Sequence, residues 1–562
     1  MVEHDETPLR RPTRRTFIKA AGATGALLGA GVPQVLLPTL WRRAGATGEP
    51  PFGLHLEFGS EPAREMTVSW VTSDAVARPR VRFGTDPDEM DETVAAETRT
   101  YVDGLSGTEV FTQHASLAEL RPNTNYAYEV LHEGAEPVRG RFKTAPKGRA
   151  PFSFTSFGDQ SIADNVNNTQ PWTSYAGLIV PEIEAAKPLF HLYNGDLCYA
   201  NVGGREALRV QVWRSFLNNN SRSARYRPWM PAAGNHENEK MDGRPNADPF
   251  KAYQTYFGLP SNGAAPDFRG LWYAFRVGSM LVISLNNDDI CYQNGGNTYV
   301  RGYSGGAQKA FLQQTLAAGR ARKDIDWIVV CMHQVAVSTA VPFNGCDLGV
   351  REDWLPLFDQ YGVDLVLTGH EHHYERTFAL RGQEGADTYR RPKVASLETG
   401  TIDTGKGTVH MILGGGGHNF PSHNKYSVKN GAFEAEIVAP LNPGAPPPAF
   451  GVPIPLINPK PREIATWSPT ILSPADPTAS HARDSGHAYG FATFDVDPGG
   501  EVGGWTTIKV RYHRVLDPLN PADTGKVVEF DSFTLRRRRR DGGDEMDGGR
   551  ESSALQLVPA ST

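Results

Sequence analysis

The sequence has few cysteines, little net charge and no long uninterrupted apolar run. Only four of the 562 residues are cysteine, and none stands in a Cys-x-x-Cys pair, which argues against a zinc knuckle. Cys331 lies in an apolar stretch and is expected to be packed, whereas Cys291 and Cys346 lie in polar segments and are left open as a pair. A formal net charge of −6 gives no sign of a nucleic-acid binder.

The length and composition indicate a globular protein of more than one domain. A chain of 562 residues is too long for one compact core. Apolar residues make up 39% and charged residues 21% of the chain, and its 58 glycines and 42 prolines indicate many turns and long loops.

The N-terminus resembles a twin-arginine export signal. Arg14 and Arg15 precede a mild apolar run over residues 20–40, which six glycines and prolines interrupt. Such a run is poor material for a transmembrane helix, and the small residues 44–46 offer a cleavage site. Residues 1–46 are therefore predicted to be a signal peptide that the twin-arginine export machinery reads. The expected location is secreted, or cell-envelope or periplasmic, and an uncleaved membrane anchor is the alternative.

Residues 50–146 have the alternating pattern of an all-β domain. Polar and apolar residues alternate at Met66–Val71, Arg80–Phe83 and Tyr126–Val130, with turn residues between them. Leu120–Tyr126 is similar to the tyrosine corner of immunoglobulin-like sandwiches. The segment resembles a fibronectin type III module, and because none of its residues suggests chemistry we expect a packing or spacer role.

From residue 150 the pattern changes to strands that alternate with helical stretches, which predicts a layered α/β domain over residues 150–535. Helical spacing is seen at Tyr175–Ala186, Trp213–Phe216 and Gln308–Leu316. The predicted strands are Phe152–Phe157, Phe190–Tyr193, Trp229–Ala233, Met280–Leu285, Trp327–Met332 and Val363–Thr368.

Five of these strands end in residues that carry oxygen or nitrogen ligands for metals. One such strand end would be ordinary, but five in one ordered series are not. Two carboxylates, an amide oxygen, three imidazoles and a phenol suit a pair of cations of differing hardness. Two metals about 3.5–4 Å apart clamp phosphate oxygens and generate hydroxide at neutral pH. The candidate ligands are Asp159, Asp196, Tyr199, Asn235, His333, His370 and His372.

These motifs together resemble the purple acid phosphatases, a family of the calcineurin-like metallophosphoesterases. The resemblance rests on Gly158-Asp159, Gly195–Tyr199, Gly234–Glu237, His333 and Gly369–His372. It implies an N-terminal immunoglobulin-like β-sandwich followed by a four-layer α/β/β/α metallophosphoesterase domain. It also implies a phosphoric monoester hydrolase (acid phosphatase) that attacks phosphorus with a metal-bound hydroxide at a dinuclear Fe(III)–M(II) site.

The resemblance also assigns a role to each candidate residue. A ferric ion would be bound by Asp159, Tyr199 and His372. A divalent zinc, manganese or iron ion would be bound by Asn235, His333 and His370. Asp196 would bridge the two metals, and His236 would be the catalytic residue that orients substrate or assists the leaving group.

The sequence departs from the family in two places. Many metallophosphoesterases have a histidine ligand, and purple acid phosphatases a glycine, where this chain has Ser161; Tyr199 is placed to supply the missing ligand. Plant members carry a histidine pair where this chain has Pro342 and Phe343. His373 is an additional histidine beside the ligand pair, but a neighbour on such a loop often points away from the site.

The C-terminal part is irregular. A proline-rich insertion is predicted at about residues 420–485, after which the strands His487–Phe494 and Thr507–His513 are expected to extend one sheet, with Phe530–Leu535 as a last strand. His418 follows a glycine run that either brings backbone close to the metals or forms a plain turn. The run Arg536–Arg540 is predicted to begin a disordered tail over residues 536–562.

The sequence thus predicts an exported, metal-dependent phosphatase that acts on a phosphate ester. A phosphodiesterase or an alkaline-type phosphatase on the same scaffold is the first alternative, and a non-catalytic metal-binding surface protein is the second. No nucleic-acid partner is expected, and contact with a membrane is expected only through an uncleaved signal. The physiological substrate, the monoester or diester preference, the divalent metal and the oligomeric state stay open.

Overall fold

The structure is a computed structural model, and it describes thirteen segments of the chain. They are residues 48–163, 175–202, 208–239, 249–292, 301–341, 346–385, 391–418, 425–429, 432–438, 462–465, 470–471, 489–516 and 526–540. The N-terminal region with Arg14 and Arg15 therefore lies outside the described residues, as do Pro342 and Phe343. Among the described residues, no helix has the length and apolar character needed to cross a bilayer.

The N-terminal domain is a sandwich of two four-stranded antiparallel sheets, as predicted. One sheet has the order β1 (Phe52–Phe58), β2 (Met66–Thr72), β6 (Glu109–Leu117), β5 (Glu97–Val102). The other has the order β4 (Glu92–Ala95), β3 (Arg80–Gly84), β7 (Asn125–Leu131), β8 (Val138–Lys143). The backbone N–H of Arg121 donates to the hydroxyl of Tyr126 at 2.9 Å, which confirms the tyrosine corner.

The second domain is built around two seven-stranded sheets. The first has the order β11 (Trp229–Pro231), β10 (Phe190–Tyr193), β9 (Phe152–Phe157), β27 (Tyr489–Asp497), β28 (Trp505–Leu516), β29 (Val528–Arg538), β21 (Thr401–Asp403). The second has the order β12 (Tyr273–Val277), β13 (Met280–Ser284), β14 (Trp327–Cys331), β17 (Leu365–Thr368), β22 (Val409–Leu413), β18 (Tyr374–Arg376), β26 (Thr470–Ile471). The C-terminal strands extend the first sheet, as the sequence predicts.

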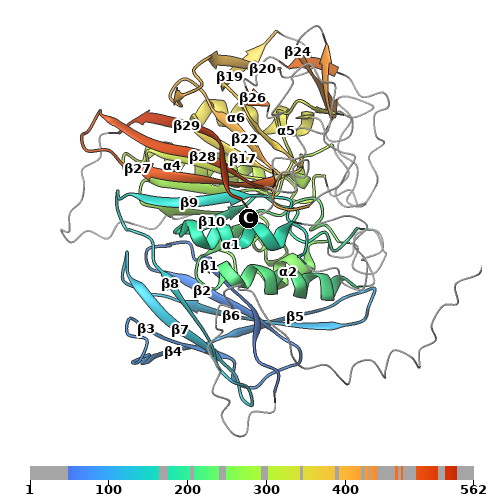
Figure 1. Cartoon of the computed structure of the whole chain (residues 1–562), viewed down its shortest axis with the longest axis vertical. Helices are drawn as coiled ribbons and strands as arrows, with labels where there is room; N and C mark the ends of the chain where they lie inside the picture. Colours follow the sequence, from blue (N-terminus) through green and yellow to red (C-terminus); the bar gives the residue numbers. More distant parts are fainter. Residues whose placement is uncertain are drawn as a thin grey trace, which may run out of the picture. The chain divides into compact units, whose positions relative to one another are not determined.

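Helices cover the outer faces of both sheets, which gives the predicted four layers (Figure 1). On the first sheet, Phe216 of α2 contacts Tyr193 with the ring centroids 6.0 Å apart. On the second sheet, Gly319 of α4 packs against Leu281 and Ile328. The helices are α1 (Ala176–Ala186), α2 (Arg209–Ala224), α3 (Lys251–Tyr256), α4 (Ala307–Ala321), α5 (Leu348–Asp353) and α6 (Leu355–Tyr361), with short 3-10 turns at Pro266–Phe268 and Asn287–Asp289.

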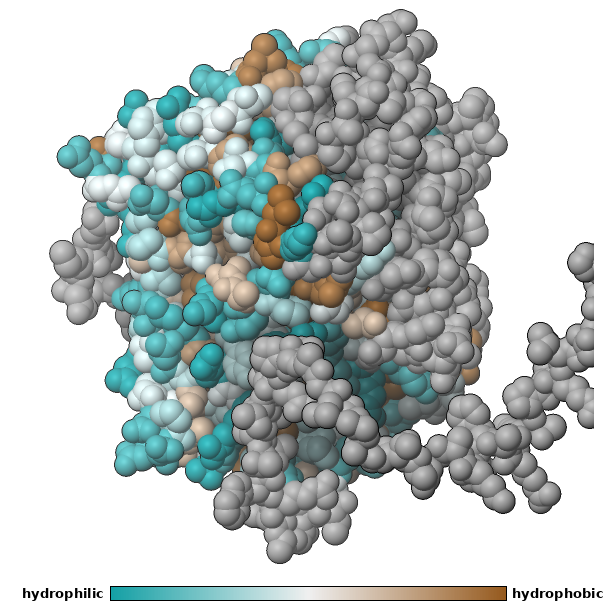
Figure 2. Space-filling model, viewed as in Figure 1, coloured by the Kyte–Doolittle hydropathy of each residue, from teal (hydrophilic) through white to brown (hydrophobic). Residues whose placement is uncertain are grey.

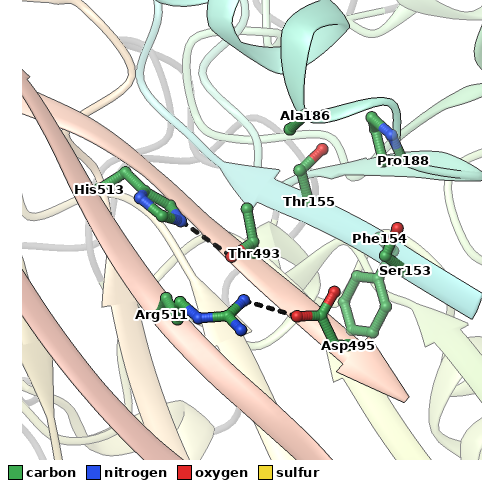
Figure 3. A pocket seen from close by; sticks show the side chains of 9 residues that line it. All are labelled: Ser153, Phe154, Thr155, Ala186, Pro188, Thr493, Asp495, Arg511 and His513. Carbon is green, nitrogen blue, oxygen red and sulfur yellow. Dashed lines mark hydrogen bonds and ion pairs between the residues drawn. The ribbon is translucent and has the colours of Figure 1, made fainter. Parts of the chain in front are cut away.

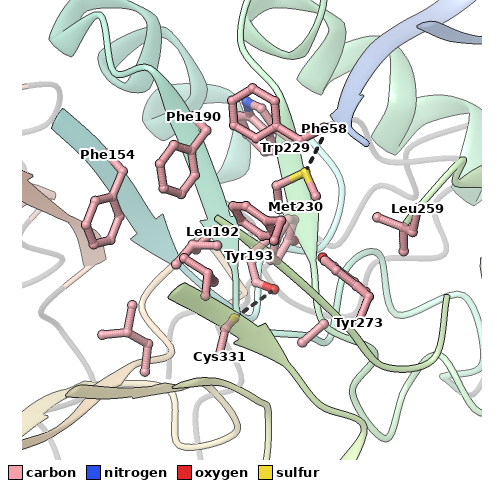
Figure 4. Close-up of a cluster of buried hydrophobic side chains, with 14 of the residues drawn as sticks. Phe58, Phe154, Phe190, Leu192, Tyr193, Trp229, Met230, Leu259, Tyr273 and Cys331 are labelled. Atoms are coloured by element: carbon pink, nitrogen blue, oxygen red, sulfur yellow. Dashed lines mark hydrogen bonds between the residues drawn. The ribbon is translucent and has the colours of Figure 1, made fainter. Parts of the chain in front are cut away.

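The core lies between the sheets and is rich in aromatic rings (Figure 4). The rings of Phe154 and Phe190 stack at 5.2 Å, and Phe190 contacts Phe275 of the second sheet at 5.7 Å. Cys331 is buried in β14, as predicted. The described part of the face in Figure 2 is mostly hydrophilic, with apolar residues scattered singly or in small groups. This agrees with the burial of most large apolar side chains in the core.

The remaining strands lie at the edges of the second domain. Two of them, β19 (Ala379–Glu384) and β20 (Arg391–Ser396), form a hairpin. The described pieces of the predicted insertion also pair as strands: β23 (Lys425–Lys429), β24 (Ala432–Val438) and β25 (Arg462–Ala465). They join β15 (Ala340–Val341) and β16 (Cys346–Asp347) in a small sheet. Most of residues 420–485 lies outside the described residues.

The sandwich packs on α2 of the second domain and contributes polar contacts. Tyr128 donates to the carbonyl of Arg225 at 2.8 Å. Asp103 forms a fully buried ion pair with Arg209 at 3.1 Å, and Arg209 also faces Glu239 at 3.7 Å. Through Arg209, the sandwich is therefore connected to Glu239, three residues after His236. This agrees with the expected packing role and is more than a spacer would provide.

One question that the sequence left open is answered, and one expectation is corrected. Cys291 and Cys346 are both buried free thiols, so they do not pair. The prediction of a disordered tail is wrong for Arg536–Arg540, whose first residues belong to β29. The guanidinium groups there find partners far away in sequence: Arg537 pairs with the buried Asp364, and Arg536 and Arg538 stack on Trp505 at 4.4 and 4.0 Å. Residues 541–562 lie outside the described residues.

Candidate metal centre

The loops after β9, β10, β11, β14 and β17 meet at one edge of the two sheets. In the first sheet β9, β10 and β11 run parallel, and in the second β13, β14, β17 and β22 run parallel. Their carboxyl ends lie close together because the loops hydrogen-bond to one another. Asp159 N donates to Gly195 O at 3.0 Å, and Gly369 N donates to His333 O at 3.1 Å. All seven predicted ligands lie on these loops.

Four of the seven predicted ligands have a left-handed backbone. The φ angles are 61° at Asp159, 51° at Asp196, 57° at Tyr199 and 71° at His370. A non-glycine residue in this region costs about 1–3 kcal/mol, and such residues concentrate at functional sites. The fold holds these side chains in place at a local energetic cost, which indicates a site and not a set of ordinary turns.

The first donor cluster consists of Asp159, Tyr199 and His372. The Tyr199 hydroxyl donates to Asp159 Oδ1 at 3.0 Å and lies 2.8 Å from His372 Nε2. His372 Nε2 lies 3.2 Å from Asp159 Oδ1. Three donor atoms of different chemistry therefore converge on one point, and all three residues are buried.

The second donor cluster consists of Asp196, His333 and His370. His333 Nε2 lies 3.0 Å from Asp196 Oδ2 and 3.3 Å from His370 Nδ1. All three residues are buried, and a ligand atom of each lies within 4.8 Å of the others. His333 Nδ1 donates to Asn194 O at 2.7 Å, which fixes the tautomer that leaves Nε2 facing the cluster.

The charges in the second cluster favour a cation. Burial lowers the pKa of His333, but the charges of Asp196 and Asp159 outweigh burial and raise it to about 10. Burial alone would raise the pKa of Asp196, whereas His333 and His236 together hold it well below its ordinary value. The site therefore stabilises positive charge in the place where a metal ion would lie.

The donor atoms fit a metal pair. Asn235 is buried, and its Oδ1 has no hydrogen-bond partner among the residues that the structure describes. A buried amide oxygen without a partner costs free energy unless it meets a donor or a cation. Carboxylate, phenol and imidazole in the first cluster suit a hard ion, whereas carboxylate and imidazole in the second suit a divalent one, and the Asn235 amide oxygen is a further candidate ligand.

His236 lies at the rim of the site, with 26% of its side chain exposed. Its Nε2 is 3.9 Å from Asp196 Oδ2, and its Nδ1 donates to Asn201 Oδ1 at 2.6 Å. The Asn201 amide is oriented because its Nδ2 donates to Asn238 O at 3.2 Å. Burial lowers the pKa of His236, opposed by the charge of Asp196. Asn201 thus fixes the His236 ring, a role that the sequence did not suggest.

Glu237 is a positioning residue that sequence reasoning also missed. Its carboxylate accepts the backbone N–H groups of Asp196 at 2.9 Å, Leu197 at 2.7 Å and Gly234 at 2.8 Å. It therefore joins the loop after β10, which carries Asp196, to the loop after β11, which carries Asn235. The signal available was its place in the motif beside two candidate site residues.

Glycines let the backbone approach the first cluster. A Cβ at Gly369 would collide with Asp159 Oδ2, and one at Gly414 would collide with Glu371 O. A Cβ at Gly414 would also come within 2.9 Å of Asp159 Oδ2, so the glycine run before His418 brings backbone close to a predicted ligand, which favours the first of the two readings over a plain turn. His418 stacks on the Tyr199 ring at 3.7 Å and lies edge-on to His372 at 4.9 Å.

Three further sequence-predicted features are placed as follows. Ser161 is buried with a φ of 68°, and its N–H donates to Leu197 O at 2.9 Å, so the turn closes without a ligand there. His373 Nε2 lies 3.2 Å from Glu375 Oε2, which agrees with the expectation that it points away from the ligands. The replacements at Pro342 and Phe343 lie outside the described residues.

A cavity of about 210 Å³ lies along the middle of β9, beside β27 and β28, and none of its lining residues is a predicted ligand (Figure 3). Arg511 lies in its wall, but it is paired with Asp495 at 2.5 Å. His513 is hydrogen-bonded to Thr493 at 2.9 Å. Because the guanidinium of Arg511 is already neutralised by Asp495, this cavity is a weaker candidate for the reactive site than the strand-end loops.

Comparisons with known proteins agree with this geometry. Residues 51–155 match the family described as purple acid phosphatase, N-terminal domain, and residues 173–374 match the calcineurin-like phosphoesterases. An uncharacterised protein of Mycobacterium tuberculosis is 46% identical over 565 residues, which cover 95% of this chain and 98% of that protein. The Fe(3+)-Zn(2+) purple acid phosphatase 12 of Arabidopsis thaliana is 27% identical over 333 residues, 58% of this chain and 65% of the plant protein.

Solved structures show the same fold. The purple acid phosphatase PPD1 from yellow lupin seeds superposes with a TM-score of 0.59 at 21% identity, covering 87% of this chain and 75% of that one. PhoD superposes with a TM-score of 0.52 at 12% identity, covering 87% of this chain and 91% of that one.

Proposed function

Because this chain belongs to the purple acid phosphatase family of metal-dependent phosphoric monoester hydrolases, we propose that it is an exported phosphatase with a dinuclear Fe(III)–M(II) centre. Phosphate monoesters are the proposed substrates. The observation that carries the proposal is the pair of donor clusters, one around Tyr199 and one around His333. Asp196 belongs to the second cluster, and its charge also raises the pKa of Tyr199 in the first.

In this proposal each cluster holds one metal. Asp159, Tyr199 and His372 would hold iron, Asn235, His333 and His370 would hold zinc, manganese or iron, and Asp196 would serve both. Bound metals would polarise the phosphoryl oxygens and supply the nucleophile at neutral pH.

Tyr199 supports iron in the first position. Burial and the charges of Asp159 and Asp196 raise the pKa of its phenol well above the ordinary value. Such a phenol ionises only beside a strong positive charge, and the resulting hard, anionic oxygen suits Fe(III) better than a divalent ion. His418 and His236, whose rings lie 3.7 and 4.4 Å from the Tyr199 ring, hold the phenol in place.

His236 is the proposed catalytic residue because of its position at the open side of the centre. Its Nδ1 is held by Asn201, so its Nε2 is the atom available to substrate. In the protonated state Nε2 would donate to a phosphoryl oxygen or to the leaving oxygen, and it is the one family histidine of this kind that the sequence retains. A diesterase on the same scaffold is the second candidate, favoured by Pro342 and Phe343 standing where plant members have histidines.

We predict that the wild-type enzyme prefers aryl over alkyl monoesters, and that His236→Ala deepens this preference. Good leaving groups depart without a proton, whereas alkoxides need one, and general acid catalysis contributes about 10²–10⁴-fold. The loss in His236→Ala should therefore approach that range for alkyl esters and be much smaller for aryl esters. The measurement is kcat/KM across a leaving-group series, with diesters included.

The matched control is His373→Ala, which removes a histidine that contacts Glu375 instead of the site. It should change all esters by the same factor. A flat series in the wild type together with equal losses in His236→Ala would show that another group supplies the proton. Asp347 is a poor candidate for this alternative proton donor, because its carboxylate accepts backbone N–H groups from Tyr292, Gly349 and Val350.

Export is the second part of the proposal and rests on the twin-arginine motif at Arg14 and Arg15. Replacing both residues by lysine keeps the charge but changes what the receptor reads. Folded protein should then accumulate in the cytoplasm, and the secreted or envelope fraction should fall to background in a fractionation experiment. The control is the same double replacement at Arg42 and Arg43, a second arginine pair in the leader, which should leave export intact. Export of the Arg14→Lys, Arg15→Lys protein at the wild-type level would exclude this route.

A further inference from the structure

A sixth strand end lies beside the centre and supplies no predicted ligand. Strand β13 ends at Ser284, which pairs with Cys331 of β14, two residues before His333. Leu285 N donates to Cys331 O at 2.9 Å, so the segments that follow β13 and β14 are still hydrogen-bonded to each other beyond the last strand pair. The 3-10 turn Asn287–Asp289 follows directly and therefore lies next to the His333 loop.

Asn287 binds the backbone of that loop with its whole amide group. Its Oδ1 accepts the N–H groups of His333 at 3.3 Å and Gln334 at 3.0 Å, and its Nδ2 donates to Gln334 O at 2.7 Å. Asn287 is fully buried. Three hydrogen bonds from one buried side chain fix the backbone from which the His333 ring projects.

Asp288 extends this contact to a second loop. Its Oδ1 accepts Gln334 Nε2, and its Oδ2 accepts Asn238 Nδ2 at 3.5 Å. Asn238 lies three residues after Asn235, in the loop that follows β11. One carboxylate therefore links the segment that carries His333 to the segment that carries Asn235.

The turn is itself anchored to the scaffold. Asn286 Oδ1 accepts Asp288 N at 3.2 Å. The side chain of Gln308, on α4, accepts Asn286 N at 2.8 Å and donates to Asn286 O at 2.9 Å and to Asp289 at 3.1 Å. The turn therefore connects the His333 and Asn235 loops to helix α4.

We propose that Asn287 and Asp288 are positioning residues for the divalent metal and not for iron; this rests on the proposed function. Their contacts go to the segments that carry His333 and Asn235, two of the three ligands assigned to that metal. The iron ligands Asp159, Tyr199 and His372 lie on the loops after β9, β10 and β17. Partners of metal ligands typically contribute 10–100-fold to metal affinity or activity.

The experiment compares Asn287→Leu and Asp288→Leu with wild type. Both variants should retain iron and its visible absorption but release the divalent metal about 10–100-fold more readily to a chelator. Added Zn²⁺ should restore kcat at concentrations raised by the same factor. Asp288→Asn keeps one acceptor oxygen for two donors and should fall between wild type and Asp288→Leu.

Asn262→Leu is the matched control, because this buried asparagine also fixes a loop, through Phe268 O at 2.7 Å and Ala264 N at 3.0 Å, away from the centre. It should lower stability without separating the two metals. If Asn287→Leu does not fold, Gln334→Met removes the contact to Asp288 and takes its place. Equal loss of both metals, or wild-type retention of the divalent metal, would overturn the inference. A wild-type protein without two metals would instead overturn the proposed function.

Discussion

Asp196→Asn should lower phosphatase activity by more than about 100-fold, because even the partners of metal ligands contribute 10–100-fold. Asp196 Oδ2 lies 3.0 Å from His333, and Oδ1 accepts the backbone N–H of His236 at 2.8 Å. Asparagine preserves the shape but removes the negative charge that, in the proposed centre, both cations would share. Metal content per chain and kcat/KM, measured on the same preparation, test this result.

Asp364→Asn is the matched control for the loss of a buried carboxylate. Asp364 is fully buried and pairs with Arg320 at 2.5 Å; it stands directly before β17, at the opposite end of that strand from the His370 loop. Its replacement should lower stability but leave two metals in the protein that remains folded. An Asp196→Asn protein with two metals and near-normal activity would show that the bridging role is wrong.

Tyr199→Phe should abolish visible charge-transfer absorption and reduce the iron content. Phenylalanine fills the same space and keeps the stacking partner of His418, but it removes the oxygen that lies 3.0 Å from Asp159 and 2.8 Å from His372. The first cluster then has two donors of its own left. The visible spectrum and the iron content of the purified variant are the measurements.

Tyr193→Phe provides the comparison, because this buried tyrosine ends β10, just before the loop that carries Tyr199, but its hydroxyl is bonded to Gln160 at 2.9 Å and Leu197 O at 3.0 Å. It should keep both colour and iron. If Tyr199→Phe had the wild-type spectrum and iron content, the first cluster would not be the iron site.

Much of the site could be predicted from sequence because it follows from strand order. Strands β9 and β10 have the predicted bounds, since short apolar runs bounded by Gly-Asp or Asn-Gly-Asp leave little freedom. Parallel strands bring their carboxyl ends to one edge. Donors that follow such strands therefore meet, as Asp159 and His372 do over 213 positions.

The supporting residues could not be predicted because they depend on contacts between loops. Asn201 and Asn287 stand in polar segments where any side chain would be compatible with a turn. Their roles arise from one hydrogen bond to His236 and three to the His333 loop. Glu237 is similar, because its three backbone donors come from two different loops.

The arginine run shows how a charge pattern misleads. Five consecutive arginines usually indicate a solvated segment, but Arg537 reaches Asp364, 173 positions earlier. The buried carboxylate of Asp364, directly before β17, needs positive partners, and Arg320 and Arg537 supply them. The sequence contains no local sign of that demand.

The proposed iron-containing dinuclear centre is tested by metal analysis of the purified wild-type protein together with its visible spectrum. We expect close to two metals per chain, one of them iron, and a visible absorption band that disappears in Tyr199→Phe. Protein that is active on phosphate monoesters but contains no iron and has no visible band would contradict it.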